Sequence, residues 1–203
     1  VCGGTGFYVR ALLYKSQFGN AGADEAVRKK YEAVLSDRGA VYLHKLLEDR
    51  DPESAKILHF NDTKRVIRAL EIFEVTGKKK SEQKDEEIPR FDFVSVSVDF
   101  PRAALYERIE RRVDKMFEDG LKEEVKGLLA RGIDEKRQCM QGIGYKEVAE
   151  GLRLGLSDEE IAEAVKKNTR NYAKRQITFF KRMQNHMLLS PQEAAAENVL
   201  SLL

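Results

Sequence analysis

A Gly-Gly-Thr-Gly turn at residues 3–6 is the first place in this sequence where the backbone is suited to a ligand. It stands between a short apolar stretch, interpreted as the end of a strand, and the start of a helix. Glycine lets a backbone approach a bound group closely, and the free N–H groups of a helix N-terminus attract an anion. The turn therefore indicates an anion site, while Thr5 also fits the simpler role of a helix N-cap.

A second candidate is a group of cations on the helix expected over residues 62–76. Lys64, Arg65 and Arg68 are three or four residues apart, so they share one face, opposite the apolar stripe of the same helix. Asp62 and Glu71 lie within reach of that face. The pattern leaves two interpretations open, a surface for an anionic partner and a set of neutralised surface pairs.

A third candidate is the glycine-rich segment over residues 141–146, Gln-Gly-Ile-Gly-Tyr-Lys. A turn that holds an amide, an aromatic ring and a cation is able to stack on an unpaired nucleobase and to hydrogen-bond with it. The alternative is a loop that starts a helix and packs its tyrosine against the protein.

The helix expected over residues 158–183 opens on a capping box, Ser157 with Glu160, and has a buried stripe that includes Ile177. It also carries the most uneven charge in the chain. No acidic residue occurs between Glu163 and Glu193, although the chain as a whole has a net charge of only +2. Seven cations fall in that interval: Lys166, Lys167, Arg170, Lys174, Arg175, Lys181 and Arg182. This stretch favours contact with phosphate groups, and a solvated helix face is the alternative.

Composition excludes several other classes of protein. A chain that is 42% hydrophobic and 34% charged is globular and not disordered. No apolar run approaches the roughly 20 residues that cross a bilayer, so no membrane partner is expected. The 2 cysteines are too few for a disulfide framework, and the 3 histidines are scattered. We therefore expect no metal bound by this chain itself, and a reducing, cytoplasmic location.

The order of elements indicates an α/β fold with an inserted helical domain. Residues 24–88 have helical patterns throughout, with helix ends expected at Gly39 and Gly77, and a helix break is expected at Gly120. Strand patterns occur at residues 91–100 and 185–190. We therefore expect residues 1–23 and 89–203 to form a partial α/β core, and residues 24–88 to form an all-helical insertion. These strand segments are too few to build a complete sheet.

Five stretches together resemble one family, and the resemblance extends over nearly the whole chain. They are "GGTGFYVRALL", "NDTKRVIRALEIFEVTGK", "RIERRVDKMFEDGLKEEVKGLL", "QGIGYKE" and "TRNYAKRQITFF". Their types and order are similar to those of the tRNA dimethylallyltransferases, also called tRNA isopentenylpyrophosphate transferases. The resemblance implies a P-loop NTPase-like, nucleotide- and ATP-binding type of core, built on an incomplete parallel sheet with flanking helices, and an all-helical insertion domain. It also implies transfer of a dimethylallyl group from dimethylallyl diphosphate to N6 of the adenosine 3′ of the anticodon in tRNA.

The resemblance assigns roles to individual residues of this sequence. Thr5 corresponds to the threonine beside the target adenosine, which makes it the catalytic candidate. Gly3, Gly4, Arg108 and Arg112 are implied on the diphosphate side. The implied tRNA-binding residues are Arg28, Lys64, Arg65, Val66, Ile67, Arg68, Gln141, Gly142, Ile143, Gly144, Tyr145, Lys146, Lys174 and Arg175. Lys64 stands where the family commonly has glutamine.

The resemblance also implies partners and a cofactor. These are the tRNA anticodon stem-loop, dimethylallyl diphosphate, and Mg²⁺ held mainly by the diphosphate and by a segment that precedes the Gly-Gly-Thr-Gly turn in the family. That segment holds the phosphate-binding loop and the general-base aspartate. We therefore expect this chain to be a C-terminal two-thirds that is inactive alone, and a monomer. Two alternatives are a non-catalytic RNA-binding module and a relative of the P-loop small-molecule kinases.

Overall fold

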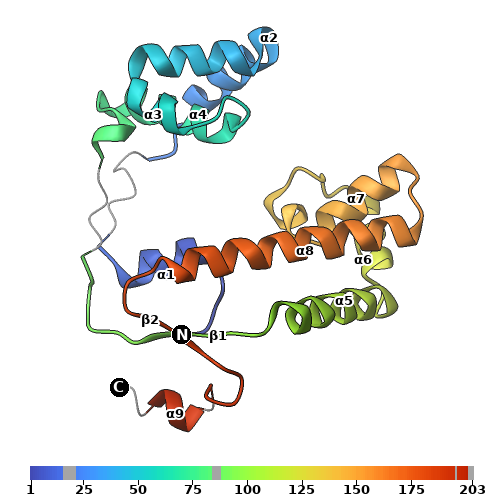
Figure 1. Cartoon of the computed structure of the whole chain (residues 1–203). Coiled ribbons are helices and arrows are strands. Elements are labelled where there is room, and N and C mark those ends of the chain that lie inside the picture. The colour runs from blue at the N-terminus through green and yellow to red at the C-terminus, as the bar shows by residue number, and fades with distance from the viewer. Residues whose placement is uncertain (16–21, 84–87, 195, 201–203) are drawn as a thin grey trace. The chain divides into compact units, whose positions relative to one another are not determined.

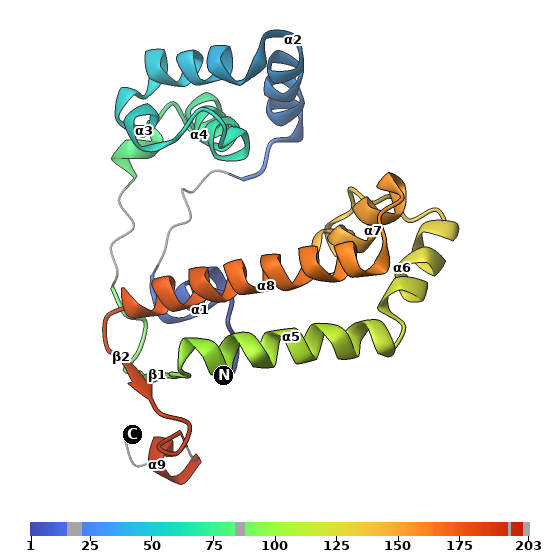
Figure 2. The same cartoon turned by 45° about the vertical axis from the view of Figure 1, so that its right-hand side comes forward.

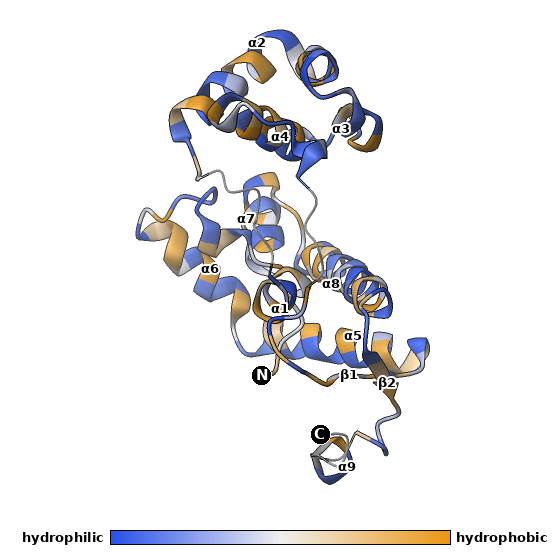
Figure 3. Cartoon of the chain, turned by 90° about the vertical axis from the view of Figure 1, so that its left-hand side faces the viewer, coloured by the Kyte–Doolittle hydropathy of each residue, from blue (hydrophilic) through white to orange (hydrophobic). Residues whose placement is uncertain are grey.

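The computed structural model describes residues 1–15, 22–83, 88–194 and 196–200. The chain divides into two units, and Figure 1 labels their elements. The helical unit is Arg10–Asp92, and the α/β unit is Val1–Val9 with Phe93–Leu203. The division falls inside helix α1 (Gly6–Leu13). In Figure 3 the helices of both units carry apolar and polar residues, as amphipathic helices around a core do.

The helical unit consists of three helices and a short 3₁₀ turn. Its elements are α2 (Glu25–Arg50), α3 (Pro52–Ile57), α4 (Thr63–Thr76) and η1 (Lys80–Glu82). Helix α4 packs its apolar face against α2, with Leu43, Leu47, Val66 and Leu70 fully buried between them. This core belongs to the helical unit alone, so it determines the positions of the cations on α2 and α4.

Local signals determine where these helices begin, bend and end. The Asp24 carboxylate caps α2 by accepting hydrogen bonds of 3.0 Å from the N–H groups of Ala26 and Val27. Gly39 has φ 78° and ψ 173°, so α2 is kinked there into the two helical halves that the sequence pattern predicts. Gly77 ends α4 in the left-handed conformation, with φ 68°.

The two chain segments that flank α2–α4 pair with each other inside the helical unit. Tyr14 and Pro89 form an isolated antiparallel bridge. The Lys15 N–H donates to the Ile88 carbonyl, and the Arg90 N–H donates to the Leu13 carbonyl, both at 2.9 Å. Tyr14 is 2% exposed, so the bridge is also anchored by a buried ring.

The α/β unit contains a small parallel sheet and a helical crossover. Strand β1 (Ser95–Val98) pairs with β2 (His186–Leu189) in the register Ser95 to His186 through Val98 to Leu189. Between the strands lie α5 (Arg102–Glu118), α6 (Leu121–Ala130), η2 (Gln138–Gln141), α7 (Tyr145–Leu154) and α8 (Asp158–Lys181). Helix α9 (Ala196–Leu200) follows β2. The protein is thus helix-rich with a small parallel sheet, which agrees with the expected α/β fold.

Helices α5 and α8 lie side by side along the α/β unit, as Figures 1 and 2 both show. Ile109, Val113 and Val165 are buried between them, and a second cluster around Val125, Val148 and Ile161 joins α6, α7 and α8. Gly120, with φ 96°, separates α5 from α6, as the sequence pattern predicts. Helix α8 starts at the predicted capping box, in which Ser157 and Glu160 bond to each other's backbone N–H groups.

Two local expectations are wrong. Val1 and Cys2 are not in a strand, because no described segment pairs with them, and Val1 is fully exposed. Ile177, expected in the buried stripe of α8, is 40% exposed, while Ile161, Val165 and Phe180 of the same stripe are buried. Within the described residues, no helix combines the length and the apolar character that crossing a bilayer demands.

Candidate functional site

The Gly-Gly-Thr-Gly turn lies against the C-terminal half of α8. The Gln176 amide donates a 2.8 Å hydrogen bond to the Gly4 carbonyl. A Cβ atom on Gly4 would collide with that amide, and one on Gly6 would collide with the Phe179 ring. A side chain at either position would therefore force Gln176 or Phe179 to shift, because the backbone of the turn touches side chains of α8.

Thr5 lies at the start of α1 with its side chain exposed. Its carbonyl accepts hydrogen bonds from Tyr8 N–H at 2.9 Å and Val9 N–H at 3.1 Å, which places it at the N-cap position. Its hydroxyl makes no hydrogen bond to any residue that the structure describes. The N-cap position is confirmed, but the hydroxyl does not cap the helix and remains available to a ligand.

The glycine-rich turn before α7 is held by a buried carboxylate. Glu147, 8% exposed, accepts a 2.7 Å hydrogen bond from the Gly144 N–H and another of 2.7 Å from the Asn168 amide on α8. Gly144 has φ 101° and is buried against Met116 and Leu121, a conformation that L-residues rarely adopt. The turn is consequently a fixed structure joined to α8.

The side chains of this turn differ in how available they are. The Tyr145 hydroxyl donates 2.6 Å to Glu124, and this hydrogen bond raises the tyrosine pKa. Gln141 donates 2.7 Å to the Glu135 carbonyl. Ile143 packs into the α5–α8 core, while Gly142 and Lys146 are exposed. Gln141 and Lys146 line one open hollow of about 200 Å³, together with Glu135, Lys136, Glu150 and Arg153.

Helix α8 connects these two turns. Asn168 contacts the glycine-rich turn and Gln176 contacts the Gly-Gly-Thr-Gly turn. Residues 168 and 176 are separated by about 12 Å along an α-helix axis. One rigid helix in the α/β unit therefore sets the spacing between the Thr5 turn and the Tyr145 turn.

The cations of α8 are partly neutralised by acids on α5. Lys166 pairs with Asp114 at 2.7 Å, and Arg170 pairs with Glu110 at 3.0 Å. Lys174 interacts with Tyr106 on α5. The pKa of Tyr106 is lowered mainly by a hydrogen bond from Arg102, and Lys174 adds to this lowering. Lys166 also pairs with Glu163 at 3.4 Å, three residues earlier, but the α5 partners of Lys166 and Arg170 lie more than 50 residues earlier and cannot be recognised from local sequence. Lys167, Arg175, Lys181 and Arg182 have no ion pair among the described residues.

The opposite face of α5 carries an exposed cationic stripe. Arg108 and Arg112 are four residues apart, as are Arg111 and Lys115, and all four side chains line an open depression of about 530 Å³ with Met116 and Asp119. Lys115 pairs with Asp119 at 3.1 Å, and the Arg108 guanidinium lies over the Phe100 ring at 4.7 Å. The two arginines assigned to the diphosphate side therefore share a larger anion-attracting surface.

The candidate cations of the helical unit differ in whether an acid pairs with them. Arg28 and Arg68 both bond to this carboxylate, at 2.9 Å and 2.7 Å, while Arg65 pairs with Asp62 at 3.2 Å. Lys64 has no ion pair among the described residues and is exposed. Val66 and Ile67 are 0% and 8% exposed, because they form the core face of α4. An RNA-facing surface on α4 would thus consist of Lys64, Arg65 and Arg68.

Metal ligation has no preformed site in the described residues. No group of three or more His, Cys, Asp or Glu side chains is placed to hold an ion there. Buried carboxylates such as Glu71 and Glu147 are occupied by arginine, amide and backbone donors.

Two features define the class of protein: an α/β unit that holds glycine-rich turns against a cationic helix, and a helical unit with its own exposed cations. The sequence model of the family described as IPP transferase matches residues 1–183. The chain belongs to the IPP transferase family.

Individual relatives agree with this assignment. The chain is 40% identical over 196 residues to a tRNA dimethylallyltransferase of Acetivibrio thermocellus, covering 95% of this chain and 63% of that protein. It is 46% identical over 184 residues to one of Pelotomaculum thermopropionicum, covering 90% and 58%. The chain therefore spans about three fifths of the length of these relatives.

Solved structures give the same result. The full-length tRNA isopentenylpyrophosphate transferase of Bacillus halodurans matches with a TM-score of 0.59 and 36% identity, over 98% of this chain and 62% of that chain. A eukaryotic dimethylallyltransferase acting on tRNA matches with a TM-score of 0.71 and 30% identity, over 96% of this chain and 53% of that chain.

Sequence reasoning missed the residues that hold the site in place. Gln176, Glu147 and Asn168 lie inside or beside motifs that the sequence singles out, yet their partners are distant in the chain. Glu71 was noted only as a neutralising acid, and its full burial was not expected. The available signal was a Glu in the middle of an apolar stripe, a position where an unpaired charge is unfavourable.

Proposed function

We propose that this chain acts in the transfer of a dimethylallyl group from dimethylallyl diphosphate to N6 of the adenosine 3′ of the anticodon in tRNA. One observation carries the proposal. The family match covers residues 1–183, and relatives named tRNA dimethylallyltransferase are 40% to 46% identical over most of the chain.

The finer architecture belongs to the same proposal. We take residues 1–23 and 89–203 as part of a P-loop NTPase-like, nucleotide-binding core, and residues 24–88 as an all-helical insertion. The parallel β1–β2 pair and the helical unit Arg10–Asp92 support this division. A cytoplasmic, monomeric protein remains our expectation.

The proposed substrate requires the protein to hold an adenosine outside its stack. Extruding a base costs a few kcal/mol, which phosphate contacts by cations offset. The proposed tRNA contacts are Arg28, Lys64, Arg65, Arg68, Gln141, Gly142, Tyr145, Lys146, Lys174 and Arg175, whereas Val66, Ile67, Ile143 and Gly144 support them from buried or partly buried positions. Thr5, whose hydroxyl lacks a described partner, is proposed to hydrogen-bond the target base. Its backbone is held by Gln176 through Gly4, so the hydroxyl is positioned before the base arrives.

The leaving diphosphate requires cations as negative charge develops on it. Arg108 and Arg112, with Gly3 and Gly4, are the proposed diphosphate contacts, and stabilising the leaving charge accelerates the bond cleavage. Mg²⁺ would add Lewis-acid stabilisation of the same leaving group. The donor set of the described residues does not fit a protein-held ion, since its buried carboxylates are already bonded, so the ion would be held by the diphosphate and by the segment that precedes the turn in the family.

The decisive experiment measures the transfer of a labelled dimethylallyl group to tRNA. The protein from the complete gene is incubated with unmodified tRNA and dimethylallyl diphosphate carrying a labelled dimethylallyl group, and the tRNA is digested to nucleosides. Labelled N6-modified adenosine from the position next to the anticodon supports the proposal. RNA binding without any label in the tRNA would replace it with a non-catalytic RNA-binding module.

A further inference from the structure

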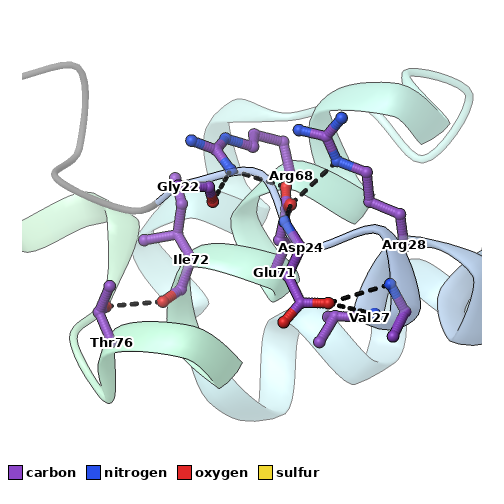
Figure 4. A network of polar contacts seen from close by, with 9 residues as sticks. Gly22, Asp24, Val27, Arg28, Arg68, Glu71, Ile72 and Thr76 are labelled. Atoms are coloured by element: carbon purple, nitrogen blue, oxygen red, sulfur yellow. Dashed lines mark hydrogen bonds and ion pairs between the residues drawn. The ribbon is translucent and has the colours of Figure 1, made fainter.

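Glu71 is a fully buried carboxylate on α4 that bonds to three donors from different parts of the helical unit. Its Oε1 accepts hydrogen bonds from the Asp24 backbone N–H at 2.7 Å and from Arg28 Nε at 2.9 Å. Its Oε2 accepts a 2.7 Å bond from Arg68 Nη1. Figure 4 shows the three groups converging on the carboxylate. The side chain is 0% exposed, so its charge depends on these partners.

The geometry of Arg28 is unusual for a simple ion pair. Glu71 takes only the Nε–H of this side chain, and Figure 4 shows both terminal nitrogens directed away from the carboxylate. The Arg28 side chain is 43% exposed. Two parallel N–H groups on a fixed guanidinium plane match two oxygens of a phosphate group. Arg28 thus has a buried attachment and an exposed fork.

The charge of the cluster points to the same type of ligand. Burial raises the pKa of Glu71, but hydrogen bonds from Arg68, the Asp24 N–H and Arg28 more than offset this effect, and its pKa lies below the usual value. Glu71 is therefore ionised at neutral pH. Together, Arg28, Arg68 and Glu71 carry a net charge of about +1, with the positive side exposed and the negative side buried.

We propose that Glu71 is a positioning residue, which holds Arg28 by its Nε so that the two terminal nitrogens bind one phosphate of an RNA loop. The inference rests on the proposed function in that it needs an RNA partner. It goes further because the affinity for RNA then depends on the orientation of the Arg28 guanidinium, which the buried Glu71 fixes, and not only on the number of positive charges.

A purely electrostatic surface and a positioned fork predict opposite results for one substitution. Glu71→Gln removes a negative charge, so a surface that works by net charge would bind RNA more tightly. A positioned fork would bind more weakly, because the amide no longer fixes the guanidinium. We expect the affinity to fall about tenfold, the loss of roughly one charge-assisted hydrogen bond.

Glu74→Gln is the matched control. Glu74 lies one turn further along α4 and bonds to Lys30 at 2.6 Å and to the Tyr31 hydroxyl at 2.5 Å, without contacting Arg28. Glu74→Gln changes the net charge by the same amount as Glu71→Gln, and we expect its RNA affinity to equal that of the wild type or to be slightly higher. Arg28→Lys is a surface variant that keeps the charge but not the fork, and we expect it to weaken binding as Glu71→Gln does.

The test measures fluorescence anisotropy of a labelled RNA hairpin with an adenosine-rich loop, titrated with the 203-residue chain over a range of salt concentrations. Circular dichroism shows whether each variant is folded at the temperature used. Weaker binding by both Glu71→Gln and Arg28→Lys, with Glu74→Gln unchanged, supports the inference. Unchanged or tighter binding by folded Glu71→Gln, or by Arg28→Lys if Glu71→Gln does not fold, overturns it.

The same titration separates this inference from the proposed function. If the wild-type chain binds no hairpin at low salt, the RNA-binding function and the inference both fail. If the wild type binds and the folded variants bind equally well, only the positioned fork fails. A further expectation is that Arg28→Ala lowers the salt-dependence slope by about 0.7, the value for one phosphate contact in single-stranded nucleic acid.

Discussion

At the scale of single residues, the Thr5 hydroxyl offers the most direct test of chemistry. It is exposed and has no partner among the described residues, while the turn that carries it is fixed to α8 through Gln176. We predict that Thr5→Ala lowers kcat about a hundredfold, the typical effect of removing one positioned hydrogen-bonding group. The Kd for tRNA should stay close to the wild-type value.

Thr5→Ser provides the control for this prediction because serine keeps the hydroxyl. We expect it to restore most of kcat, as measured by labelled dimethylallyl transfer under single-turnover conditions. Equal losses in kcat and in tRNA affinity for Thr5→Ala would contradict a role beside the reacting base. They would point to Thr5 as part of the binding surface alone.

His186 allows a pH-dependent prediction in the α/β unit. Its Nδ1 lies 2.8 Å from the Ser95 hydroxyl, its Nε2 is buried with no partner among the described residues, and its ring stacks on Phe180 with centroids 5.2 Å apart. Burial lowers the pKa of His186 below its ordinary 6.5. The unfolded chain therefore binds a proton more readily, and the stability of the unit should fall as pH decreases below about 6.5.

His186 is the only histidine of the α/β unit, because His44 and His59 lie in the helical unit. His186→Phe keeps the ring stacked on Phe180 and should flatten the stability profile between about pH 5.5 and pH 7.5. Native-state hydrogen exchange of α8 amides measures this stability. An unchanged slope in the variant would assign the pH dependence to other groups.

Residue types and spacing alone were enough to find the cations but not their partners. Arg28 and Arg68 are 40 residues apart in sequence, so nothing local indicates that they share the Glu71 carboxylate. In the same way, nothing local indicates that Lys166 and Arg170 pair with acids on α5. Which cations are free for a ligand is decided by tertiary packing, which a single sequence does not contain.

At the scale of elements, the sequence was informative where a boundary depends on a local signal. The capping box at Ser157, and glycines at positions 39, 77 and 120, correctly predicted where helices begin, bend or end. The strands β1 and β2 were also expected, β1 from its alternation of apolar and polar residues. The strand expected at Val1 and Cys2 was wrong, because a strand needs a pairing neighbour and no local pattern provides one.

The contact between α7 and α8 gives a prediction about packing. Gly151 on α7 faces Ile161 on α8, and a Cβ atom built on this glycine would overlap with the Ile161 side chain. We predict that Gly151→Ala destabilises the α/β unit by about 1–3 kcal/mol through overpacking. Chemical denaturation followed by circular dichroism measures the change.

Gly127→Ala is the matched control, since Gly127 lies inside α6 and a Cβ atom there meets no atom within 4 Å. We expect that variant to be stabilised by about 0.5–1 kcal/mol, the helix-propensity difference between glycine and alanine. Similar effects of both substitutions would mean that helix propensity, and not the close α7–α8 approach, determines the outcome at Gly151.

At the scale of the whole molecule, the net charge of +2 says little, because the functional charge is distributed locally. The exposed cationic stripe of α5 and the group of Arg28, Arg68 and Glu71 each carry net positive charge, while many other charges cancel in pairs. RNA binding by such local surfaces should weaken with salt even though the chain as a whole is nearly neutral. Composition thus could not predict an RNA partner, and the family motifs were needed.

The two units each have their own core, and this leads to the last prediction. Leu70 is 0% exposed in the core of the helical unit, and Val125 is 0% exposed in the core around α6, α7 and α8. Leu70→Ala removes buried methyl groups and leaves a cavity, which should cost the helical unit about 2–5 kcal/mol. Hydrogen exchange read by mass spectrometry should then show faster exchange in α2 and α4 and unchanged protection in α6–α8.

Val125→Ala is the reciprocal variant and should accelerate exchange in α6–α8 while α2 and α4 keep their protection. Since neither core cluster contains a residue of the other unit, a cavity in one removes no buried contact from the other. Loss of protection in both units after either substitution would show that they unfold as one cooperative structure. Selective loss would mean that the helical unit with its Glu71 cluster can be altered without unfolding the unit that carries Thr5.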